Sequence, residues 1–244
     1  MLSFAEVSVA LTPLVRAAVI VDADGTLVPI APRPDLARVH PDAADALAGL
    51  VGRTGLVAVV SGRPRDEVAA LVGVEGPTYV GVYGLEDEAP LPPALLRRLR
   101  EIVAPVGGAW VEPKGAAVSV HVRAAGDPLV AEAILAPLLE AVARAEGLVV
   151  VRGKYTLELA PAGLPRKGGV IERLVAAHDV EAVLFAGDDR PDLEGFEVLD
   201  GLRAAGRSTV KVAVTGAETP SELEAAADLV VDGPAGLAAL LASL

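Results

Sequence analysis

The sequence predicts an α/β protein that has a parallel-sheet core and a smaller inserted α+β domain with an antiparallel sheet. Two observations carry this prediction. Short apolar runs alternate with helical patterns before residue 88 and again after residue 163. Between these parts, each helical pattern is followed by two strand patterns in succession. Alternation of strands and helices is typical of a parallel sheet, whereas strands that follow each other directly are typical of an antiparallel one.

The first part of the chain predicts a βαβαβ unit. Residues 17–21 and 56–60 are continuous apolar runs, which indicate strands buried on both faces. Residues 41–51, between them, carry apolar side chains at helical spacing. A helix over about 65–72 and a strand over about 78–83 complete the unit. Its crossovers are expected to be right-handed, which gives a Rossmann-like parallel sheet.

The end of the chain repeats this order. We expect helices near 167–177 and 193–205 and after 235, and strands at 182–186, 210–214 and 229–231. The core domain is therefore predicted to comprise residues 1–88 and 163–244. Residues 89–162 are then an insertion, flanked by an acidic, proline-rich stretch over 86–93 and a Pro/Gly hinge over 161–165.

The insertion is predicted to contain one small unit that occurs twice. We expect helices near 92–103 and 127–145, and strands near 109–112, 117–122, 148–152 and 156–159. In chain order these elements read αββαββ. Successive strands of this kind predict an antiparallel sheet, so the insertion is expected to fold as an α+β domain.

Composition narrows the classes of function. The formal net charge is −12, from 33 acidic and 21 basic residues, and only 3% of residues are aromatic. Such a chain repels polyanions and offers no stacking platform, so nucleic acid is not the expected ligand. No apolar run reaches the roughly 18 residues that span a bilayer, and the first residues lack the basic segment of a signal peptide. There is no cysteine for a disulfide or a thiolate site, and a cytoplasmic enzyme without a membrane partner is the expectation.

Polar residues follow the predicted strands of the core. They are Asp22, Asp24, Gly25 and Thr26 after the first strand, Ser61, Gly62 and Arg63 after the second, and Asp188, Asp189 and Asp192 after the strand at 182–186. Ligands of a parallel sheet bind at the carboxyl ends of its strands. Carboxylates a few ångströms apart repel one another and need a cation between them. Because the candidate ligands are hard oxygen atoms, Mg²⁺ is the expected metal.

A carboxylate beside Mg²⁺ can act as a nucleophile toward phosphorus and form an aspartyl-phosphate, provided that the negative charge around it is offset. A lysine would supply the remaining positive charge. The chain has four lysines, and Lys167 opens the helix that precedes Asp188. Gly168 and Gly169 follow it and permit close approach of the backbone.

These motifs carry a resemblance to a known family. Residues 21–27 (VDADGTL) resemble the first motif of the haloacid-dehalogenase-like phosphohydrolase superfamily, and Ser61, Lys167 and residues 187–189 (GDD) fall in the order of its other three motifs. Within the superfamily the chain is similar to the trehalose-6-phosphate phosphatase family. The similar stretches are 24–30 (DGTLVPI), 61–63 (SGR), 81–86 (GVYGLE), 111–114 (VEPK), 120–123 (VHVR), 152–154 (RGK) with Glu158, and 187–196 (GDDRPDLEGF).

The resemblance implies a role for each matched residue of the core. Asp22 would be the nucleophile, and Asp24 would protonate the leaving sugar oxygen and then activate water. Ser61 would hydrogen-bond the transferring phosphoryl group, whose charge Lys167 would offset. The Mg²⁺ ligands that it implies are Asp22, Asp24, Asp188 and Asp189, with Asp192 as a further ligand or a support for the others. The inserted domain would be a cap that determines substrate specificity and closes to exclude water from the phosphoenzyme.

The resemblance also implies substrate contacts, which are Gly25, Thr26, Gly62, Arg63, Glu112, Lys114, Arg123 and Glu158. His121 is expected to face away from Arg123 and therefore not to contact the same ligand. The chain departs from the family pattern at Tyr83, where histidine is usual, and over residues 190–194. These departures leave every reacting group in place and concern the substrate more than the reaction.

The resulting hypothesis is an Mg²⁺-dependent phosphatase that hydrolyses trehalose 6-phosphate to trehalose and phosphate, with a trehalose-phosphate synthase as a further partner. One alternative is a phosphatase of another sugar phosphate or of a glycosyl-phosphoglycerate. Another is a catalytically silent sugar-phosphate sensor. Simpler roles also exist for some of these residues: Asp189 and Asp192 suit the start of a helix, and the charged residues of the cap suit cross-strand ion pairs.

Overall fold

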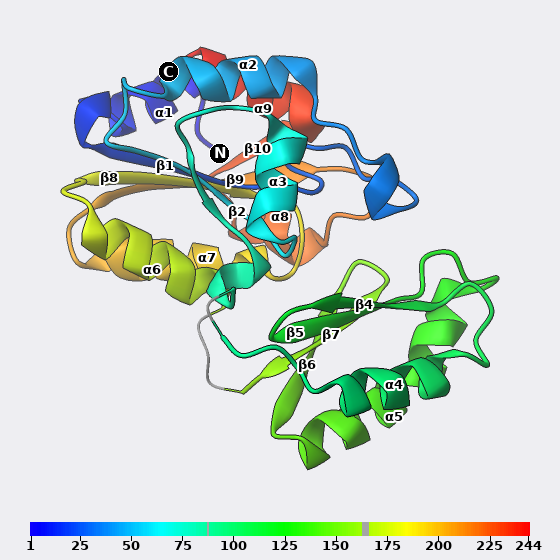
Figure 1. Cartoon of the computed structure of the whole chain (residues 1–244). Coiled ribbons are helices and arrows are strands. Elements are labelled where there is room, and N and C mark those ends of the chain that lie inside the picture. The colour runs from blue at the N-terminus through cyan, green and yellow to red at the C-terminus, as the bar shows by residue number, and fades with distance from the viewer. Residues whose placement is uncertain (87, 163–165) are drawn as a thin grey trace. The chain divides into compact units, whose positions relative to one another are not determined.

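The computed structural model describes residues 1–86, 88–162 and 166–244, and the chain forms two compact units (Figure 1). Unit 1 comprises residues 1–84 and 165–244, and unit 2 comprises residues 85–164. Parts of both predicted flanks, Asp87 and residues 163–165, lie outside the described residues. Boundaries at 88/89 and 162/163 therefore stay a prediction.

Unit 1 is built on a parallel sheet of six strands. Its strands are β1 (Ala17–Asp22), β2 (Leu56–Val60), β3 (Thr78–Val80), β8 (Ala182–Gly187), β9 (Ser208–Thr215) and β10 (Leu229–Asp232). Their order in the sheet is β10-β9-β8-β1-β2-β3, and each neighbouring pair is parallel. The predicted Rossmann-like sheet is confirmed. Because β1 lies between β2 and β8, the two distant parts of the chain meet at β1.

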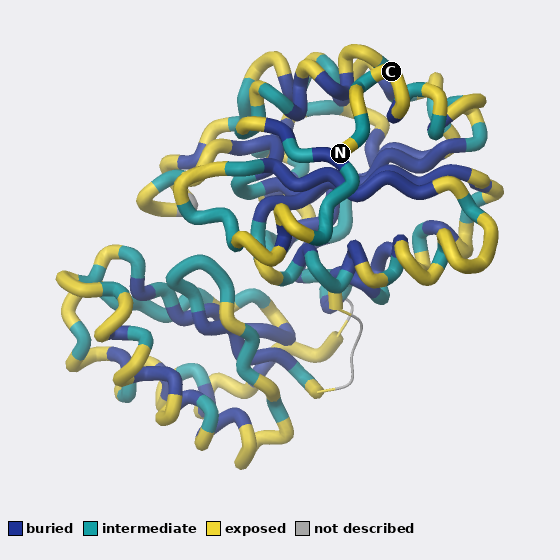
Figure 2. The backbone as a smooth tube through the Cα atoms, turned by 180° about the vertical axis from the view of Figure 1, so that it is seen from behind, coloured by how far each residue is buried: buried dark blue, intermediate teal, exposed yellow. Residues whose placement is uncertain are grey.

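Two layers of helices cover the sheet (Figure 1). The helices of one layer are α1 (Phe4–Ala10), α2 (Pro41–Leu50), α3 (Arg65–Val72) and α9 (Gly233–Ala242), and those of the other are α6 (Lys167–Ala177), α7 (Asp192–Ala204) and α8 (Ser221–Ala226). Successive strand residues point to opposite faces, so Val19 packs under the first layer and Ile20 under the second. Both are fully buried, and the strands of this sheet are mostly dark blue in Figure 2. Burial of one such side chain contributes about 1.5–3 kcal/mol.

The segment after β3 differs from the prediction of a strand over 78–83. The strand ends at Val80, and a short 3₁₀ helix, η3 (Val82–Gly84), follows. The backbone N–H groups of Val82 and Tyr83 donate to the carbonyl oxygens of Arg63 and Ser61. These hydrogen bonds turn the chain toward the end of β2, whereas a longer β3 would continue straight past that end.

Some short helices of unit 1 have no counterpart in the prediction. Helix α1 has 7 residues and α8 has 6, and two further 3₁₀ helices, η1 (Leu14–Arg16) and η2 (Pro34–Leu36), have 3 each. Two turns or fewer are too short to show a helical period. For α1 a sequence signal existed, because Ser3 and Glu6 form a capping box at its start.

Unit 2 is an antiparallel sheet with two helices, in the predicted order αββαββ. The elements are α4 (Pro93–Val103), β4 (Trp110–Lys114), β5 (Ala117–His121), α5 (Pro128–Ala145), β6 (Leu148–Gly153) and β7 (Thr156–Pro161), and the sheet order is β4-β5-β7-β6. The side chains of Leu99 and Leu135 pack against Val118 and Leu157 in its core. Alternate residues of the strands, Ser119 among them, point to the opposite face.

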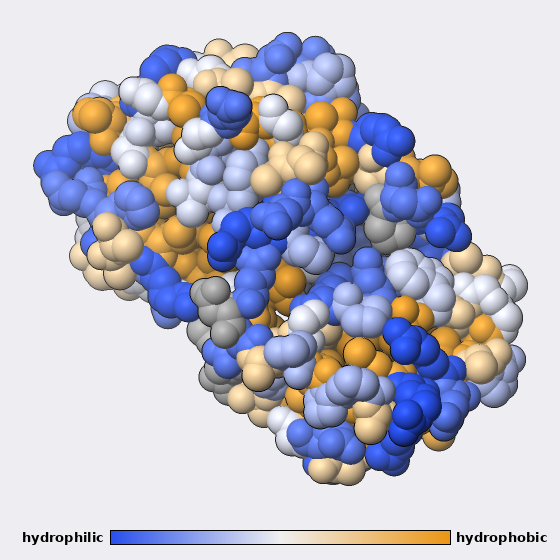
Figure 3. Space-filling view, viewed as in Figure 1, coloured by the Kyte–Doolittle hydropathy of each residue, from blue (hydrophilic) through white to orange (hydrophobic). Residues whose placement is uncertain are grey.

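None of the described helices is long and apolar enough to cross a lipid bilayer. In Figure 3, blue hydrophilic residues are mixed with orange hydrophobic ones on the surface of each unit. Mixed surfaces of this kind are ordinary for folded proteins, in which apolar atoms supply more than half of the accessible surface.

Candidate active site

Three buried carboxylates meet at one edge of the parallel sheet. Asp22 is the last residue of β1, and Asp188 directly follows the neighbouring strand β8. Asp192 begins α7, one turn further along. Each residue offers an oxygen atom, and these atoms all lie within 4.8 Å of one another. The three residues are almost inaccessible, with relative exposures of 6%, 2% and 1%.

Lys167 contacts two of the three carboxylates. Its Nζ donates to Asp22 Oδ1 at 2.6 Å and to Asp192 Oδ1 at 2.5 Å, and the residue is 3% exposed. It reaches this place because α6 runs close to α7: a Cβ on Gly168 would lie 3.0 Å from the carbonyl oxygen of Glu194. The structure therefore joins Lys167 to a carboxylate 145 residues away in the sequence.

The charges of this group do not balance. Burial raises the pKa of the Asp22 carboxyl, Asp192 and Asp188 raise it further, and Lys167 only partly opposes them, so that it lies well above its usual range. Burial lowers the pKa of the Lys167 ammonium, but Asp192 and Asp22 outweigh this and hold it well above its usual range. Lys167 thus stays charged, with a single positive charge among three carboxylates. A divalent cation would offset the remainder, and an all-oxygen donor set fits Mg²⁺.

Asp192 also fixes the loop that carries Asp188. Its Oδ2 accepts hydrogen bonds from the backbone N–H groups of Asp188 and Asp189, both at 2.9 Å. Asp189 Oδ1 accepts from the N–H of Arg190, and within the described part of the chain Asp189 does not join the group of three carboxylates. The structure therefore brings Asp192 together with Asp22 and Asp188, whereas the resemblance ranks Asp189 ahead of Asp192 as a metal ligand. A metal contact of Asp189 stays a prediction.

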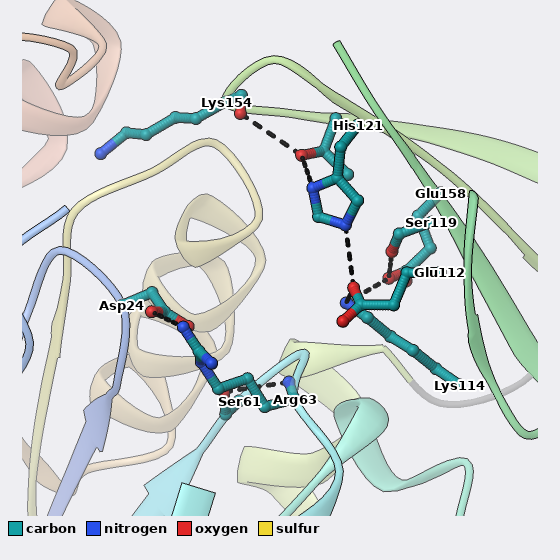
Figure 4. Close-up of polar contacts among 10 residues, drawn as sticks. Asp24, Ser61, Arg63, Glu112, Lys114, Ser119, His121, Lys154 and Glu158 are labelled. Atoms are coloured by element: carbon teal, nitrogen blue, oxygen red, sulfur yellow. Dashed lines mark hydrogen bonds and ion pairs between the residues drawn. The ribbon is translucent and has the colours of Figure 1, made fainter. Parts of the chain in front are cut away.

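Asp24 lies next to this group but pairs with a different residue. Arg63 Nε donates to Asp24 Oδ2 and Arg63 Nη2 to Asp24 Oδ1, both at 2.7 Å (Figure 4). The Asp24 side chain is 38% exposed and that of Arg63 13%. The backbone N–H of Arg63 donates to the Oγ of buried Ser61 at 3.1 Å, which fixes the loop after β2. The sequence motifs predict a substrate contact for Arg63 and do not predict this pair.

Gly25 and Thr26 hold the turn after β1 against Asp188. Thr26 Oγ1 is fully buried and donates to Asp188 Oδ1 at 3.2 Å. Gly25 has a φ of +89°, and a Cβ there would lie 1.9 Å from Asp188 Oδ2. The turn therefore needs a glycine both for its backbone conformation and for the close approach of Asp188.

Replacing Gly25 by Ala is expected to displace Asp188 and to remove divalent-cation binding, because the added methyl group overlaps the carboxylate. The control is Gly52→Ala, where φ is +77° and nothing lies within 4 Å of the added Cβ. This control should lose only about 1–2 kcal/mol of the free energy of unfolding, which is the cost of holding alanine in a left-handed backbone conformation. Isothermal titration with Mg²⁺ and thermal melts measure both. Retained cation binding in the folded Gly25→Ala variant would contradict the close-approach explanation.

Unit 2 carries a second group of charged side chains, which lie close together in Figure 4. They come from the sheet face opposite the hydrophobic core of this unit. Lys114 Nζ lies 3.4 Å from Glu112 Oε2 and 3.8 Å from Glu158 Oε2. Ser119 Oγ donates to Glu158 Oε2 at 3.1 Å. Glu112 lies opposite Ser119, and Ser119 opposite Glu158, so the pairing of β4, β5 and β7 places them in one row. These charged residues therefore form ion pairs across neighbouring strands, which is the simpler of the two roles that the sequence suggested for them.

His121 belongs to the same group, so the expectation that it lies on the face opposite the proposed substrate contacts was wrong, whereas its role toward a ligand stays a prediction. Its Nε2 lies 2.8 Å from Glu112 Oε2, and its ring stacks on Trp110 with centroids 4.0 Å apart. Ser119 and His121 are two apart in β5, and residues at this spacing share a face of the sheet. The sequence alone could therefore have indicated the position of His121. Although burial opposes it, the contacts with His121 and Lys114 lower the pKa of Glu112 to about 2.

Arg123 follows β5 and stacks on an aromatic ring. Its guanidinium carbon lies 4.9 Å from the centroid of the Tyr155 ring, and Nη2 donates to the carbonyl oxygen of Lys154 at 3.4 Å. Tyr155 has a φ of +55° in the two-residue turn between β6 and β7. The turn thereby presents Tyr155 to Arg123.

Comparison with known proteins identifies relatives over most of the chain. The family described as trehalose-phosphatase matches residues 20–92 and 95–232. An uncharacterized glycosyl hydrolase of Mycobacterium tuberculosis is 34% identical over 206 residues, and the trehalose-phosphate phosphatase of Mycolicibacterium paratuberculosis is 35% identical over 204 residues. Each match covers 75% of this chain but only 15% and 51% of the respective relative. The chain thus spans about half the length of the second relative and much less of the first.

Solved structures show the same fold. The C-terminal domain of the C. albicans trehalose-6-phosphate phosphatase has a TM-score of 0.79 at 21% identity and covers 98% of this chain and 96% of its own. The C-terminal domain of the Candida albicans trehalose synthase regulatory protein has a TM-score of 0.70 at 14% identity, with coverage of 99% and 98%. The core motifs and the inserted αββαββ unit occur in one chain whose sequence fits the family almost throughout. The chain belongs to the trehalose-phosphatase family.

Proposed function

We propose that this chain is an Mg²⁺-dependent phosphatase that hydrolyses trehalose 6-phosphate to trehalose and phosphate through an aspartyl-phosphate on Asp22. Membership of the trehalose-phosphatase family supports the substrate class, a sugar phosphate. The observation that carries the reaction is the contact of buried Lys167 with Asp22 beside Asp188 and Asp192. A sensor would need to bind phosphate but would not need a buried carboxylate nucleophile with its own counter-charge.

In the first half-reaction, a carboxylate oxygen of Asp22 forms a bond to phosphorus while the bond from phosphorus to the sugar oxygen breaks. Asp24 gives its proton to that leaving oxygen. Arg63 donates to both oxygens of Asp24 and thereby orients the carboxyl group. An incoming phosphate dianion offers Arg63 a second anion, which would loosen this pair.

In the second half-reaction, Asp24 accepts a proton from water as the water oxygen attacks the phosphorus of the aspartyl-phosphate. The bond from phosphorus to the Asp22 oxygen breaks, which returns the free carboxylate and releases phosphate. Ser61 would donate a hydrogen bond to the phosphoryl oxygens, and Lys167 would offset their charge throughout. Mg²⁺, held by Asp22 and Asp188 and directly or indirectly by Asp192, would supply the further positive charge that phosphoryl transfer requires.

Recognition of the sugar is proposed for unit 2. Glu112, Lys114 and Glu158 form a group of charged donors and acceptors on one sheet face, and Arg123 follows the adjoining strand. Alternating donors and acceptors of this kind suit the hydroxyl groups of a disaccharide. Gly25, Thr26, Gly62 and Arg63 remain proposed contacts of the phosphate end.

The test is phosphate release from trehalose 6-phosphate, with sucrose 6-phosphate and glucose 6-phosphate as matched esters. We expect release from the trehalose ester with at least about 100-fold higher kcat/KM than from the other two, since a site built to hydrogen-bond a substrate hydroxyl rejects a partner that leaves its groups unpaired. Comparable or faster release from another ester would refute the substrate assignment and keep the chemistry. Binding of the ester without any release in Mg²⁺ would favour the silent sensor.

A further inference from the structure

The turn after β3 holds an unusual backbone conformation next to the active site. Val82 and Tyr83 have φ values of +43° and +50°, a region that side chains other than glycine rarely adopt, and for β-branched Val82 it is a clear outlier. Hydrogen bonds fix the turn to the loop after β2, with Val82 N donating to Arg63 O at 2.9 Å and Tyr83 N to Ser61 O at 3.0 Å. Such strain persists only where the surroundings impose it, and it concentrates at functional sites.

This conformation places the Tyr83 ring between two parts of the site. The ring centroid lies 5.3 Å from Nζ of Lys167. The other end of the ring lies over Gly62, where an added Cβ would be 2.9 Å from the phenol oxygen and 3.0 Å from Cζ. Tyr83 therefore spans the distance from the loop after β2 to the ammonium group at the start of α6.

We propose that Tyr83 is a positioning residue that holds the Lys167 ammonium against Asp22 through the face of its aromatic ring. Lysine has a long flexible side chain, and Nζ donates to two acceptors here, Asp22 at 2.6 Å and Asp192 at 2.5 Å. The ring face, whose centroid lies 5.3 Å from Nζ, attracts the cation and limits the positions that it can take. This inference rests on the proposed phosphatase reaction, in which Lys167 must offset the charge of the transferring phosphoryl group.

The ring face and the hydroxyl group predict different results on substitution. Tyr83→Leu removes the ring and should lower kcat about 10-fold to 100-fold, with KM changed less than about 3-fold, because the lost interaction positions Lys167, which acts on the transferring group. Tyr83→Phe keeps the ring, so its kcat should lie within about 3-fold of the wild-type value. Tyr79→Leu is the matched control: Tyr79 lies in β3, and its hydroxyl donates to Val74 O at 2.7 Å, away from these carboxylates.

A double-mutant cycle tests whether the effect passes through Lys167. Tyr83→Leu should lower kcat much less in a Lys167→Met background than in the wild type, since the group that it positions is absent. Thermal melts in Mg²⁺ check that each variant folds. If Lys167→Met does not fold, the comparison of Leu and Phe at position 83 with Leu at position 79 decides alone.

The outcomes separate this inference from the proposed function. A wild-type protein that releases no phosphate overturns both. An active wild type with an unchanged Tyr83→Leu variant overturns only the role of Tyr83. That role is also overturned if the loss is equal in the two backgrounds, if Tyr83→Phe is as slow as Tyr83→Leu, or if Tyr79→Leu lowers kcat as strongly.

Discussion

Replacing Asp22 by Asn is expected to lower phosphate release by a factor on the order of 10⁴ or more, the usual scale for loss of a covalent nucleophile. The amide has nearly the same shape as the carboxylate but cannot attack phosphorus. Because burial and the neighbouring carboxylates raise the pKa of Asp22, loss of its charge relieves repulsion. The melting temperature should therefore stay equal or rise. Steady-state phosphate release and thermal melts measure the two effects.

Asp45→Asn is the matched control for this variant, because Asp45 is exposed on α2 and the same chemical change there should alter neither quantity. Acid quenching after mixing with ³²P-labelled substrate should trap labelled wild-type protein and no labelled Asp22→Asn variant. Activity of the variant within about 10-fold of the wild type, or label on the variant, would show that another residue is the nucleophile.

Removal of divalent cations is expected to lower phosphate release by at least about 10³-fold, since a metal ion supplies several kcal/mol of transition-state charge stabilisation. In the structure, three carboxylates lie within 4.8 Å of one another, and Lys167 is the ammonium that contacts two of them. Mg²⁺ should also raise the melting temperature, because an ion that binds only the folded state at 100 times its Kd contributes about 2.7 kcal/mol. Chelation followed by Mg²⁺ titration measures both.

Two Asp→Asn variants locate this effect. Asp188→Asn should lose most of the Mg²⁺-dependent rise in melting temperature, whereas Asp200→Asn should keep it. Asp200 pairs with Lys211 at 2.7 Å and is not a member of the carboxylate group. Full activity in excess chelator, or an equal Mg²⁺ response of the two variants, would show that these carboxylates do not hold the metal.

The sequence by itself determined the architecture of this protein. The runs at 17–21 and 56–60 are apolar throughout and do not alternate between apolar and polar residues. Such runs are typical of strands buried on both faces, and these two form β1 and β2. Helices α3 and α6 begin and end at the predicted residues, because their apolar faces repeat at helical spacing. The same local signal predicted the order αββαββ of unit 2. It also located Asp22 and Asp188 at strand ends, since Asp22 follows an apolar run directly and Asp188 follows one after Gly187.

Only the tertiary structure decided which side chains meet. The family resemblance puts Asp189 ahead of Asp192 as a ligand, but the first turn of α7 directs Asp192 to Lys167. Likewise, nothing local predicts that Arg63 binds both oxygens of Asp24, or that the turn after β3 brings Tyr83 to Lys167. The physical reason is that such contacts depend on rotamers and on close approach between distant segments, as with the 145 residues between Asp22 and Lys167. Local periodicity determines the elements, whereas packing determines the site.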